Sequence, residues 1–388
     1  MEKTIYKGYG SADENAAVVE MINRVFSPNR DDGFDFYRLL PKLYLEQYSP
    51  ATHNLIVREG DEIKAAIGLF YNTLTVGNKA LKTGGIGNVA VSADCRGKGY
   101  MIDCMNLALD DMIKNGTAVS FLGGQRQRYG YFSYDKGGVQ YSFSISPKNL
   151  HHVFGKDVDT DFTVTPLSEN DSASLDSIYA LHSEELCRME RPRRDLYNIL
   201  VSWENVPYTV THNSEFKGYF IANDELDGIE EIILNDPADL KDTLLAIFKL
   251  NGGKGISLSM PCYRKAYTDF LSDNCEGYNL EHNEGITILD FRAVTEAYLQ
   301  LKSTYLRLCD TDTTVLIHGK ARDERLRFLV HNNSVSVTET DRTPDLEFSH
   351  NEALRCFFSV YMPHEGGIPA GFRSLFPLPL YINGADGV

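Results

Sequence analysis

Four residues in the first third of the chain have the types and spacing of an anion-binding turn: Arg96, Gly97, Lys98 and Gly99. They follow residues 84–91, which read as a strand, and precede residues 100–113, which read as an amphipathic helix. Glycine lets the backbone approach a ligand closely, and amides at a helix N-terminus bind anions. The turn therefore predicts a phosphate site, with a basic surface turn as the alternative interpretation. It is neither a P-loop nor a Rossmann turn, because GxxxxGK[ST] and GxGxxG are absent.

This segment resembles motif A of the GNAT superfamily of N-acetyltransferases, in which a Val-x-Val strand precedes R-x-x-G-x-G/A. Met101 stands where the motif has Gly or Ala, and that departure points to the enhanced intracellular survival (Eis)-like branch. The resemblance implies acetyl-coenzyme A as co-substrate. The residues it implies for coenzyme binding are Val89, Ala90, Val91, Arg96, Gly97, Lys98, Gly99, Tyr100, Met101 and, after the next predicted strand, Gly124.

A tyrosine-rich stretch, residues 121–134, follows the predicted strand at 119–122. Its Tyr129-Gly130 pair, with Phe132 and Tyr134 behind it, resembles the Y-G-x-F-x-Y run of Eis-like proteins. The resemblance implies that Tyr129 is the general acid that protonates the coenzyme sulfur. A phenol, with a usual pKa of about 10, remains a proton donor at neutral pH. The alternative is that the stretch is core packing, which is our interpretation for Tyr131 and Tyr134.

The base is not evident in the predicted strand at 84–91, which contains no acidic residue. The Eis resemblance implies that the C-terminal carboxylate, here that of Val388, enters the active site of the first domain. The tail around Pro377 and Pro379 is apolar, as expected for a docked chain end. Eis-like chains commonly end in an aromatic residue, whereas this one ends in valine, and Asp386 is a rival carboxylate. A water relay is the remaining alternative.

The residues at 26–36 lie where GNAT enzymes place the helices that bind the acceptor. Phe26 and Phe36 are the candidate substrate-binding residues there, and Asp31 and Asp32 add negative charge. An aromatic and acidic mixture suits a cationic amine, although core packing explains the phenylalanines equally well. By family resemblance the acceptor is an aminoglycoside, a polyamine or a lysine-like amine, acetylated by direct transfer in a ternary complex.

Hydrophobic periodicity predicts an α/β (α+β) chain with three domains. Residues 1–148 are expected to form the catalytic GNAT domain, and residues 149–289 a second α/β unit that has a helix around 177–189 and lacks the RGxG turn. Residues 290–388 are expected to form a small α+β domain with a hairpin and a capped helix at Ser349. By resemblance these are tandem GNAT folds followed by a sterol-carrier-protein-like domain. The second unit, unable to hold the coenzyme, would wall the acceptor pocket.

Composition narrows the function classes. The net charge of −16, from 38 Lys plus Arg against 54 Asp plus Glu, argues against a nucleic-acid or anionic-membrane binder. Seven scattered cysteines without a CxxC pair, and histidines without metal spacing, predict no metal site. The same cysteine usage, with no apolar leader and no long apolar run, predicts a cytoplasmic protein. Four arginines (Arg188, Arg191, Arg193 and Arg194) read as a solvated helix face or an interface.

Three functions remain open from the sequence. The first is the acetyl-coenzyme A dependent N-acetyltransferase, which by resemblance forms a homo-oligomer, possibly a hexamer. The second is a noncatalytic acyl-coenzyme A or lipid-binding protein that uses the third domain. The third is acylation of a peptide N-terminus, because N-myristoyltransferases also combine GNAT-like halves with a C-terminal carboxylate.

Overall fold

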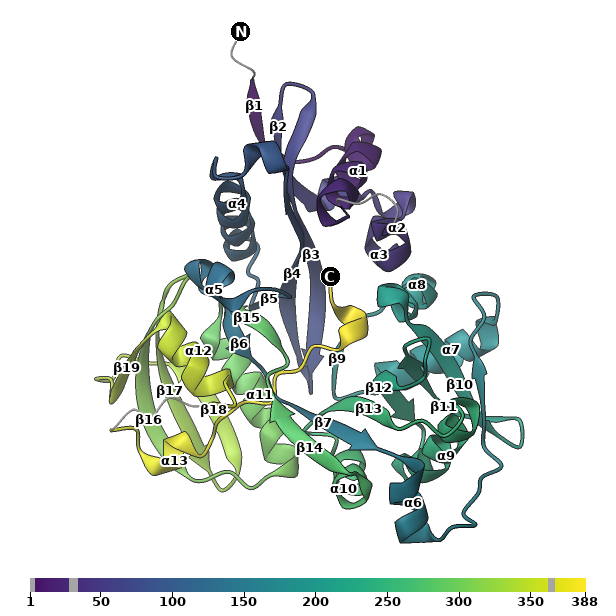
Figure 1. The fold of residues 1–388 in the computed structure, drawn as a ribbon. Coiled ribbons are helices and arrows are strands. Elements are labelled where there is room, and N and C mark those ends of the chain that lie inside the picture. The colour runs from purple at the N-terminus through teal and green to yellow at the C-terminus, as the bar shows by residue number, and fades with distance from the viewer. Residues whose placement is uncertain (1–3, 28–33, 362–366) are drawn as a thin grey trace.

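The computed structural model describes residues 4–27, 34–361 and 367–388, so Asp31 and Asp32 lie outside the described residues. Three β-sheets of eight, seven and four strands, with helices packed around them, form the described chain (Figure 1). The mixed α/β class predicted from the sequence is confirmed. No helix in these three ranges is both long enough and apolar enough to span a bilayer.

The first sheet has the strand order β1-β2-β3-β4-β5-β15-β6, and β9 pairs with β3. Neighbouring strands are antiparallel except for β4 and β5, which run parallel. A parallel pair needs a crossover connection, and here it is the helix α4 (Tyr100–Lys114). The strands are β1 (Ile5–Tyr9), β2 (Asn54–Glu59), β3 (Glu62–Val76), β4 (Lys79–Val91), β5 (Val119–Leu122), β6 (Asp135–Gly137), β9 (Cys187–Met189) and β15 (Glu284–Ile288).

Two amphipathic helices cover opposite faces of this sheet. One is α1 (Asn15–Phe26), whose buried side chains pack with Ile56, Ala66 and Ala90. The other is α4, whose buried side chains pack with alternate strand residues such as Leu55, Val57 and Ala65. Successive strand residues point to opposite faces, so the alternation assigns one helix to each side. The short helices α2 (Phe36–Leu39), α3 (Pro41–Tyr44) and α5 (Arg126–Tyr129) complete this unit.

The second sheet repeats the plan of the first. Its order is β14-β7-β13-β12-β11-β10-β8, and its parallel pair, β12 and β13, is joined by the helix α9. Its strands are β7 (Gln140–Ile145), β8 (Thr163–Pro166), β10 (Val206–His212), β11 (Glu215–Ala222), β12 (Gly228–Leu234), β13 (Ile256–Pro261) and β14 (Gly277–Glu281). Its helices are α6 (Pro147–Phe154), α7 (Ser172–Ser183), α8 (Leu196–Leu200), α9 (Leu240–Leu250) and α10 (Lys265–Asn274).

The third unit is a four-stranded sheet packed against helices. Its strands are β16 (Thr311–His318), β17 (Asp323–His331), β18 (Ser334–Glu339) and β19 (Leu346–Ser349), and its helices are α11 (Phe291–Tyr305), α12 (His350–Phe358) and α13 (Ala370–Arg373). The predicted capping box is present, because Ser349 and Glu352 exchange hydrogen bonds at the start of α12. Phe328, Phe357, Phe372 and Phe376 pack together in its core, with ring centroids 4.5 to 6.4 Å apart.

The sheets exchange strands across the predicted domain boundaries. Strand β7 precedes residue 148 but belongs to the second sheet, whereas β9 and β15 lie beyond it and belong to the first. The sequence also predicted one helix over 177–189. The structure instead ends α7 at Ser183, because Cys187–Met189 pairs with Leu74–Val76 of β3. The three units are therefore tied together by backbone hydrogen bonds as well as by side chains.

Candidate active site

The predicted anion-binding turn lines an open cleft at the edge of the first sheet. We call it the turn cleft. Its volume is about 640 Å³, within the range of roughly 300 to 1,000 Å³ typical of small-molecule sites. It is lined by the end of β4, the turn, the start of α4, the end of α1 and α5: Val25, Phe26, Val89, Val91, Cys95, Arg96, Gly97, Gly99, Tyr100, Met101, Ile102 and Arg128.

Backbone geometry makes this turn accessible to an anion. Gly97 and Gly99 adopt φ values of +84° and +85°, which favour glycine, and a Cβ on either would meet nothing within 4 Å. The helix α4 begins at Tyr100 without a side-chain cap from any described residue. Its first amides therefore have no partner within the helix and are available to a ligand. Arg96 and Arg128 supply positive charge in the cleft.

Lys98 and Tyr100 meet a carboxylate in the structure. Lys98 Nζ donates a hydrogen bond to Glu59 Oε1 at 2.7 Å, and the Tyr100 hydroxyl donates to the same oxygen. These two hydrogen bonds lower the pKa of Glu59. Lys98 is thus turned toward Glu59, while Arg128, which the sequence analysis did not single out, lines the cleft.

Ala90 and Gly124 were also predicted to contact the coenzyme. The Ala90 side chain is buried on the other face of the sheet, among residues packed under α1. Gly124 has φ +145°, and a Cβ there would lie 2.5 Å from Cε2 of Tyr129. Glycine at this position therefore lets the Tyr129 ring lie directly against the backbone.

Tyr129 ends α5 and is only 7% exposed. Burial raises its pKa, and neighbouring Arg128 opposes that rise, so the phenol is protonated at neutral pH. Among the described residues it lines neither the turn cleft nor the cavity around Val388 described below. Core packing is confirmed for Tyr134, which is buried with its hydroxyl 2.6 Å from the Ser120 hydroxyl. It is wrong for Tyr131, which is 86% exposed.

The C-terminal residue lies on β4, where β4 and β5 separate. The two strands pair only from Thr83 with Val119 to Gly85 with Phe121. A Cβ on Gly85 would lie 2.6 Å from Cγ2 of Val388, and one on Gly87 would lie 3.1 Å from the Val388 carboxyl carbon. These two glycines make the room that the chain end occupies. From the sequence, these two glycines were predicted only to be part of a strand. Glycine inside a strand often marks a place where another part of the chain or a ligand approaches the backbone closely.

Val388 also lines a cavity of about 190 Å³, which we call the tail cavity. Its walls carry aromatic, acidic and one lysine side chain: Lys42, Leu43, Phe70, Tyr71, Asn72, Phe121, Glu190, Pro192, Asp195, Ile199, Asp386 and Val388. Burial lowers the pKa of Lys42 to about 7, with Asp386 opposing and Arg191 adding to the shift. The Lys42 ammonium donates to the carbonyl oxygen of Ala385.

Asp386, the rival carboxylate, is engaged elsewhere. Arg191 donates to it from Nε at 2.8 Å and from Nη2 at 2.9 Å. The same guanidinium donates to Glu231 at 2.8 and 2.9 Å. Both carboxylate oxygens of Asp386 therefore accept hydrogen bonds from the guanidinium of Arg191.

Two other groups of predicted residues lie away from the tail cavity. Phe36 is buried against Tyr44 in the core, and Phe26, 46% exposed, lines the turn cleft. The four arginines do not share a helix face, because Arg188 lies on β9 and Arg193 and Arg194 lie in a 3₁₀ turn. Arg191 is 3% exposed and forms the ion pairs with Asp386 and Glu231, so the interface interpretation fits it.

Comparison with known proteins agrees with this geometry. Residues 9–136 match the family model described as the acetyltransferase (GNAT) domain. No curated protein matches the chain by sequence. In the described residues, no group of three or more His, Cys, Asp and Glu side chains is placed to hold a metal ion.

Solved structures share the fold of almost the whole chain. An Enterococcus faecalis V583 protein described as a "Probable N-Acyltransferase" has a TM-score of 0.66 at 14% identity, over 93% of this chain and 91% of that one. Eis1 from Mycobacterium abscessus has a TM-score of 0.64 at 14% identity, over 98% of both chains. A GCN5-related N-acetyltransferase from Kribbella flavida has a TM-score of 0.60 at 17% identity, over 91% and 88%.

Residues 9–136 therefore match a GNAT acetyltransferase domain, within a chain that shares the fold of solved GNAT structures. The fold of the chain as a whole is Eis-like. The open turn with unpartnered helix amides fits the pyrophosphate of an acyl-coenzyme A co-substrate.

Proposed function

We propose that the protein transfers the acetyl group of acetyl-coenzyme A to a primary amine of a cationic acceptor, by direct transfer in a ternary complex. The turn cleft would bind the coenzyme, and the tail cavity would receive the amine. The observation that carries the proposal is the placement of the Val388 carboxyl against Gly87 of β4, the strand whose far end lines the turn cleft. One strand thus contacts both candidate sites.

Charge in the tail cavity favours a cationic acceptor. Glu190, Asp195 and the Val388 carboxylate line it, and the carboxylate of Asp386 is neutralised by Arg191. The one lysine of the lining, Lys42, opposes them less than a free lysine would, because burial lowers its pKa to about 7. Phe70 and Phe121 provide apolar and aromatic walls. An ammonium bound among these groups gains both charge attraction and cation–π contact. An aminoglycoside, a polyamine and a lysine side chain all meet this description.

The proposed chemistry uses two groups of the chain. The Val388 carboxylate accepts a proton from the ammonium, so that the amine nitrogen can attack the thioester carbonyl carbon. As the new C–N bond forms, the C–S bond breaks and its electron pair goes to sulfur. Tyr129 donates its phenolic proton to the thiolate, the nitrogen of the new amide gives up its second proton to solvent, and the Tyr129 phenolate regains a proton from solvent. Holding amine and thioester in line supplies much of the rate enhancement.

The remaining expectations are proposals of the same kind. The third unit is proposed to be sterol-carrier-protein-like and to serve as a scaffold, because aromatic side chains fill its core. The protein is proposed to act in the cytoplasm as a homo-oligomer, possibly a hexamer.

The decisive experiment measures thiol release from acetyl-coenzyme A with a panel of amines, namely aminoglycosides, spermidine and lysine peptides, and with an uncharged polyol as comparison. A variant with Gly-Ser appended after Val388 moves the terminal carboxylate, and the same dipeptide before Met1 is its control. We expect turnover with a cationic amine, lost only in the C-terminal variant. Tight coenzyme binding without turnover of any amine would instead support the acyl-coenzyme A or lipid-binding alternative, and preference for long acyl chains would support peptide acylation.

A further inference from the structure

The last residues of the chain cross from the second sheet to the first. Asn383 Nδ2 donates to the Glu230 carbonyl oxygen of β12 at 3.3 Å, and Gly384 lies against the Glu230 side chain. A Cβ on Gly387 would lie 3.4 Å from Nε1 of Trp203, the only tryptophan of the protein. One residue further on, Val388 lies on β4. The tail is thus held at both ends of this crossing.

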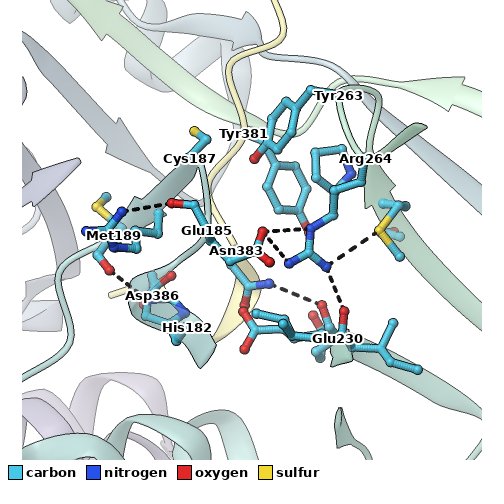
Figure 2. A pocket seen from close by; sticks show the side chains of 17 residues that line it. His182, Glu185, Cys187, Met189, Glu230, Tyr263, Arg264, Tyr381, Asn383 and Asp386 are labelled. Carbon is cyan, nitrogen blue, oxygen red and sulfur yellow. Dashed lines mark hydrogen bonds and ion pairs between the residues drawn. The ribbon is translucent and has the colours of Figure 1, made fainter. Parts of the chain in front are cut away.

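The cleft of the second unit is the place where this crossing begins (Figure 2). It lies between β12 and β13, which pair only at Gly228 and Ile229 and then separate, as β4 and β5 do. Tyr381, Asn383 and Asp386 of the tail line it together with residues of the second unit such as His182 and Arg264. The remaining space is about 40 Å³, room for one or a few water molecules. The tail therefore fills the position that a ligand would take in this unit.

Three buried charged side chains fix the tail in that cleft. The side chains of Arg191, Glu231 and Asp386 are 1%, 6% and 6% exposed. Arg191 donates twice to each carboxylate, from Nε and Nη2 to Asp386 and from Nη1 and Nη2 to Glu231. Tyr219 adds a hydrogen bond from its hydroxyl to Glu231 at 2.7 Å. We call Arg191, Glu231 and Asp386 the latch.

The geometry of the latch both attracts the two carboxylates to Arg191 and determines where they lie. A guanidinium is planar and its donors have fixed directions, so two bidentate pairs define where both carboxylates lie. Replacing buried ion pairs by apolar side chains often costs little stability. Simple stabilisation of a chain end would therefore not require three buried charges, whereas accurate placement would.

We propose that Arg191, oriented by Glu231, is a positioning residue that holds Asp386 and thereby sets the Val388 carboxylate at Gly87. Val388 follows Asp386 by two positions, a span of at most about 7 Å of extended chain. Movement of Asp386 therefore moves the proposed base. In this arrangement the cleft of the second GNAT-like unit binds the protein's own tail, and this binding positions the terminal carboxylate in the first unit. This inference rests on the proposed function.

A test independent of catalysis uses the fluorescence of Trp203. Asp386→Asn keeps the shape of the side chain but removes the charge that Arg191 binds. Glu230→Gln is the matched control, because this side chain lines the same cleft and touches Gly384, yet makes no ion pair in the described structure. We expect Asp386→Asn to shift the Trp203 emission to longer wavelength and to increase acrylamide quenching, with circular dichroism unchanged. Glu230→Gln should leave both unchanged.

The kinetic test separates positioning from structure. We expect Asp386→Asn to lower kcat at pH 7 by at least about tenfold, since misplacement by about 1 Å can cost 10²-fold. The KM for acetyl-coenzyme A should stay within about twofold, because the turn cleft is untouched. The rate of the variant should rise with pH toward the pKa of the amine, because the solvent then supplies the deprotonated form. The other titratable groups that line the tail cavity, Lys42, Tyr71, Glu190 and Asp195, are the same in both proteins.

Each outcome has one meaning. An unchanged Trp203 signal in Asp386→Asn would overturn the latch itself. A changed signal with wild-type kcat and pH profile would overturn the link between the latch and the carboxylate. If the wild-type protein acetylates no amine, the proposed function fails, and the Trp203 measurement still decides whether Asp386 holds the tail. If Asp386→Asn unfolds, Glu231→Gln, which leaves Asp386 paired with Arg191, should weaken the same two signals to a smaller extent.

Discussion

The two β-α-β units of the molecule have the same topology but different turns. In the first, β4 leads through Arg96–Gly99 into α4, and in the second, β12 leads through Asn235–Asp239 into α9. Both units separate their parallel strands beyond the first two or three residue pairs. Topology alone therefore does not determine which unit holds a coenzyme.

The chemistry of the second turn explains the difference. Asp236 accepts a hydrogen bond from the Ala238 amide at 2.9 Å, so a carboxylate of the protein itself caps the 3₁₀ turn Pro237–Asp239 that leads into α9. Pro237 has no amide hydrogen to offer, and Asp239 adds a second negative charge. A phosphate would meet repulsion and lack donors there. The first turn has two glycines, open space and arginine instead.

The clefts differ in the same sense. The turn cleft has a volume of about 640 Å³, whereas the cleft of the second unit retains about 40 Å³. In the first unit, glycines on β4 admit the terminal valine; in the second, charged side chains hold the segment just before it. The same strand geometry thus serves catalysis in one unit and, on our proposal, placement of the catalytic group in the other.

The largest loss of activity is expected from a change at Tyr129, which lies after β5, the second strand of the parallel pair in the first unit. Tyr129→Phe should lower kcat by at least about 100-fold, because a general acid typically contributes 10² to 10⁴. The control is Tyr131→Phe, because Tyr131 lies close by in the sequence but is 86% exposed. This variant should keep the wild-type rate. Steady-state kinetics with saturating acetyl-coenzyme A measures both. Equal rates for the two variants would remove Tyr129 from the mechanism and weaken the catalytic distinction between the units.

The next largest effect follows from giving the first turn the acidic character of the second. Gly99→Asp places a carboxylate in the anion site, and we expect coenzyme affinity to fall about 30-fold, or ~2 kcal/mol. Strain at positive φ contributes as well, so the control is Gly77→Asp. Gly77 has φ +58° and open space around it in the β3–β4 turn, away from the turn cleft. Isothermal titration calorimetry with coenzyme A measures the difference. Similar losses in both variants would mean that strain, not charge at the site, is responsible.

The smallest expected effect comes from removing an acidic residue from the turn of the second unit. Asp236→Ala removes the cap of the Ala238 amide, and we expect unfolding to become easier by about 1 kcal/mol, as for other N-cap losses. Coenzyme binding should remain at one equivalent per chain, because Pro237 still lacks a donor. Asp242→Ala, further along α9, is the control for charge and should change stability less. A second bound equivalent of coenzyme would show that Asp236 alone had closed this site.

Local patterns in the sequence predicted the first turn and its helix well. The apolar spacing of Met105, Leu109 and Met112 fixed the helix at 100–113, and the structure has it at Tyr100–Lys114. The strand at 119–122 and the hairpin of the third unit were also correct. These elements are governed by side-chain periodicity and turn residues that lie within a few positions of one another.

Long-range pairing was the part that local patterns could not reveal. The sequence of β9 was predicted to be the end of a helix, because the residues Cys187–Met189 contain no local pattern that indicates pairing with β3. Arg191 read as one of four arginines on a solvated helix face or at an interface, and its partners could not be named, since Glu231 and Asp386 lie far along the chain. Gly85 and Gly87 carried a readable signal, because glycine inside a strand often marks a close approach. What approaches them is visible only in the folded chain.

The position of β15 has a consequence for how the protein is made. This strand lies between β5 and β6 in the catalytic sheet, yet β5 ends at Leu122 and β15 begins at Glu284. During translation, β5 and β6 therefore each have one unpaired edge until the whole second unit has been synthesised. Such non-local closure is slow and leaves strand edges open to wrong partners. The catalytic sheet therefore matures after its neighbour, and a fragment that ends before β15 should require a chaperone or aggregate.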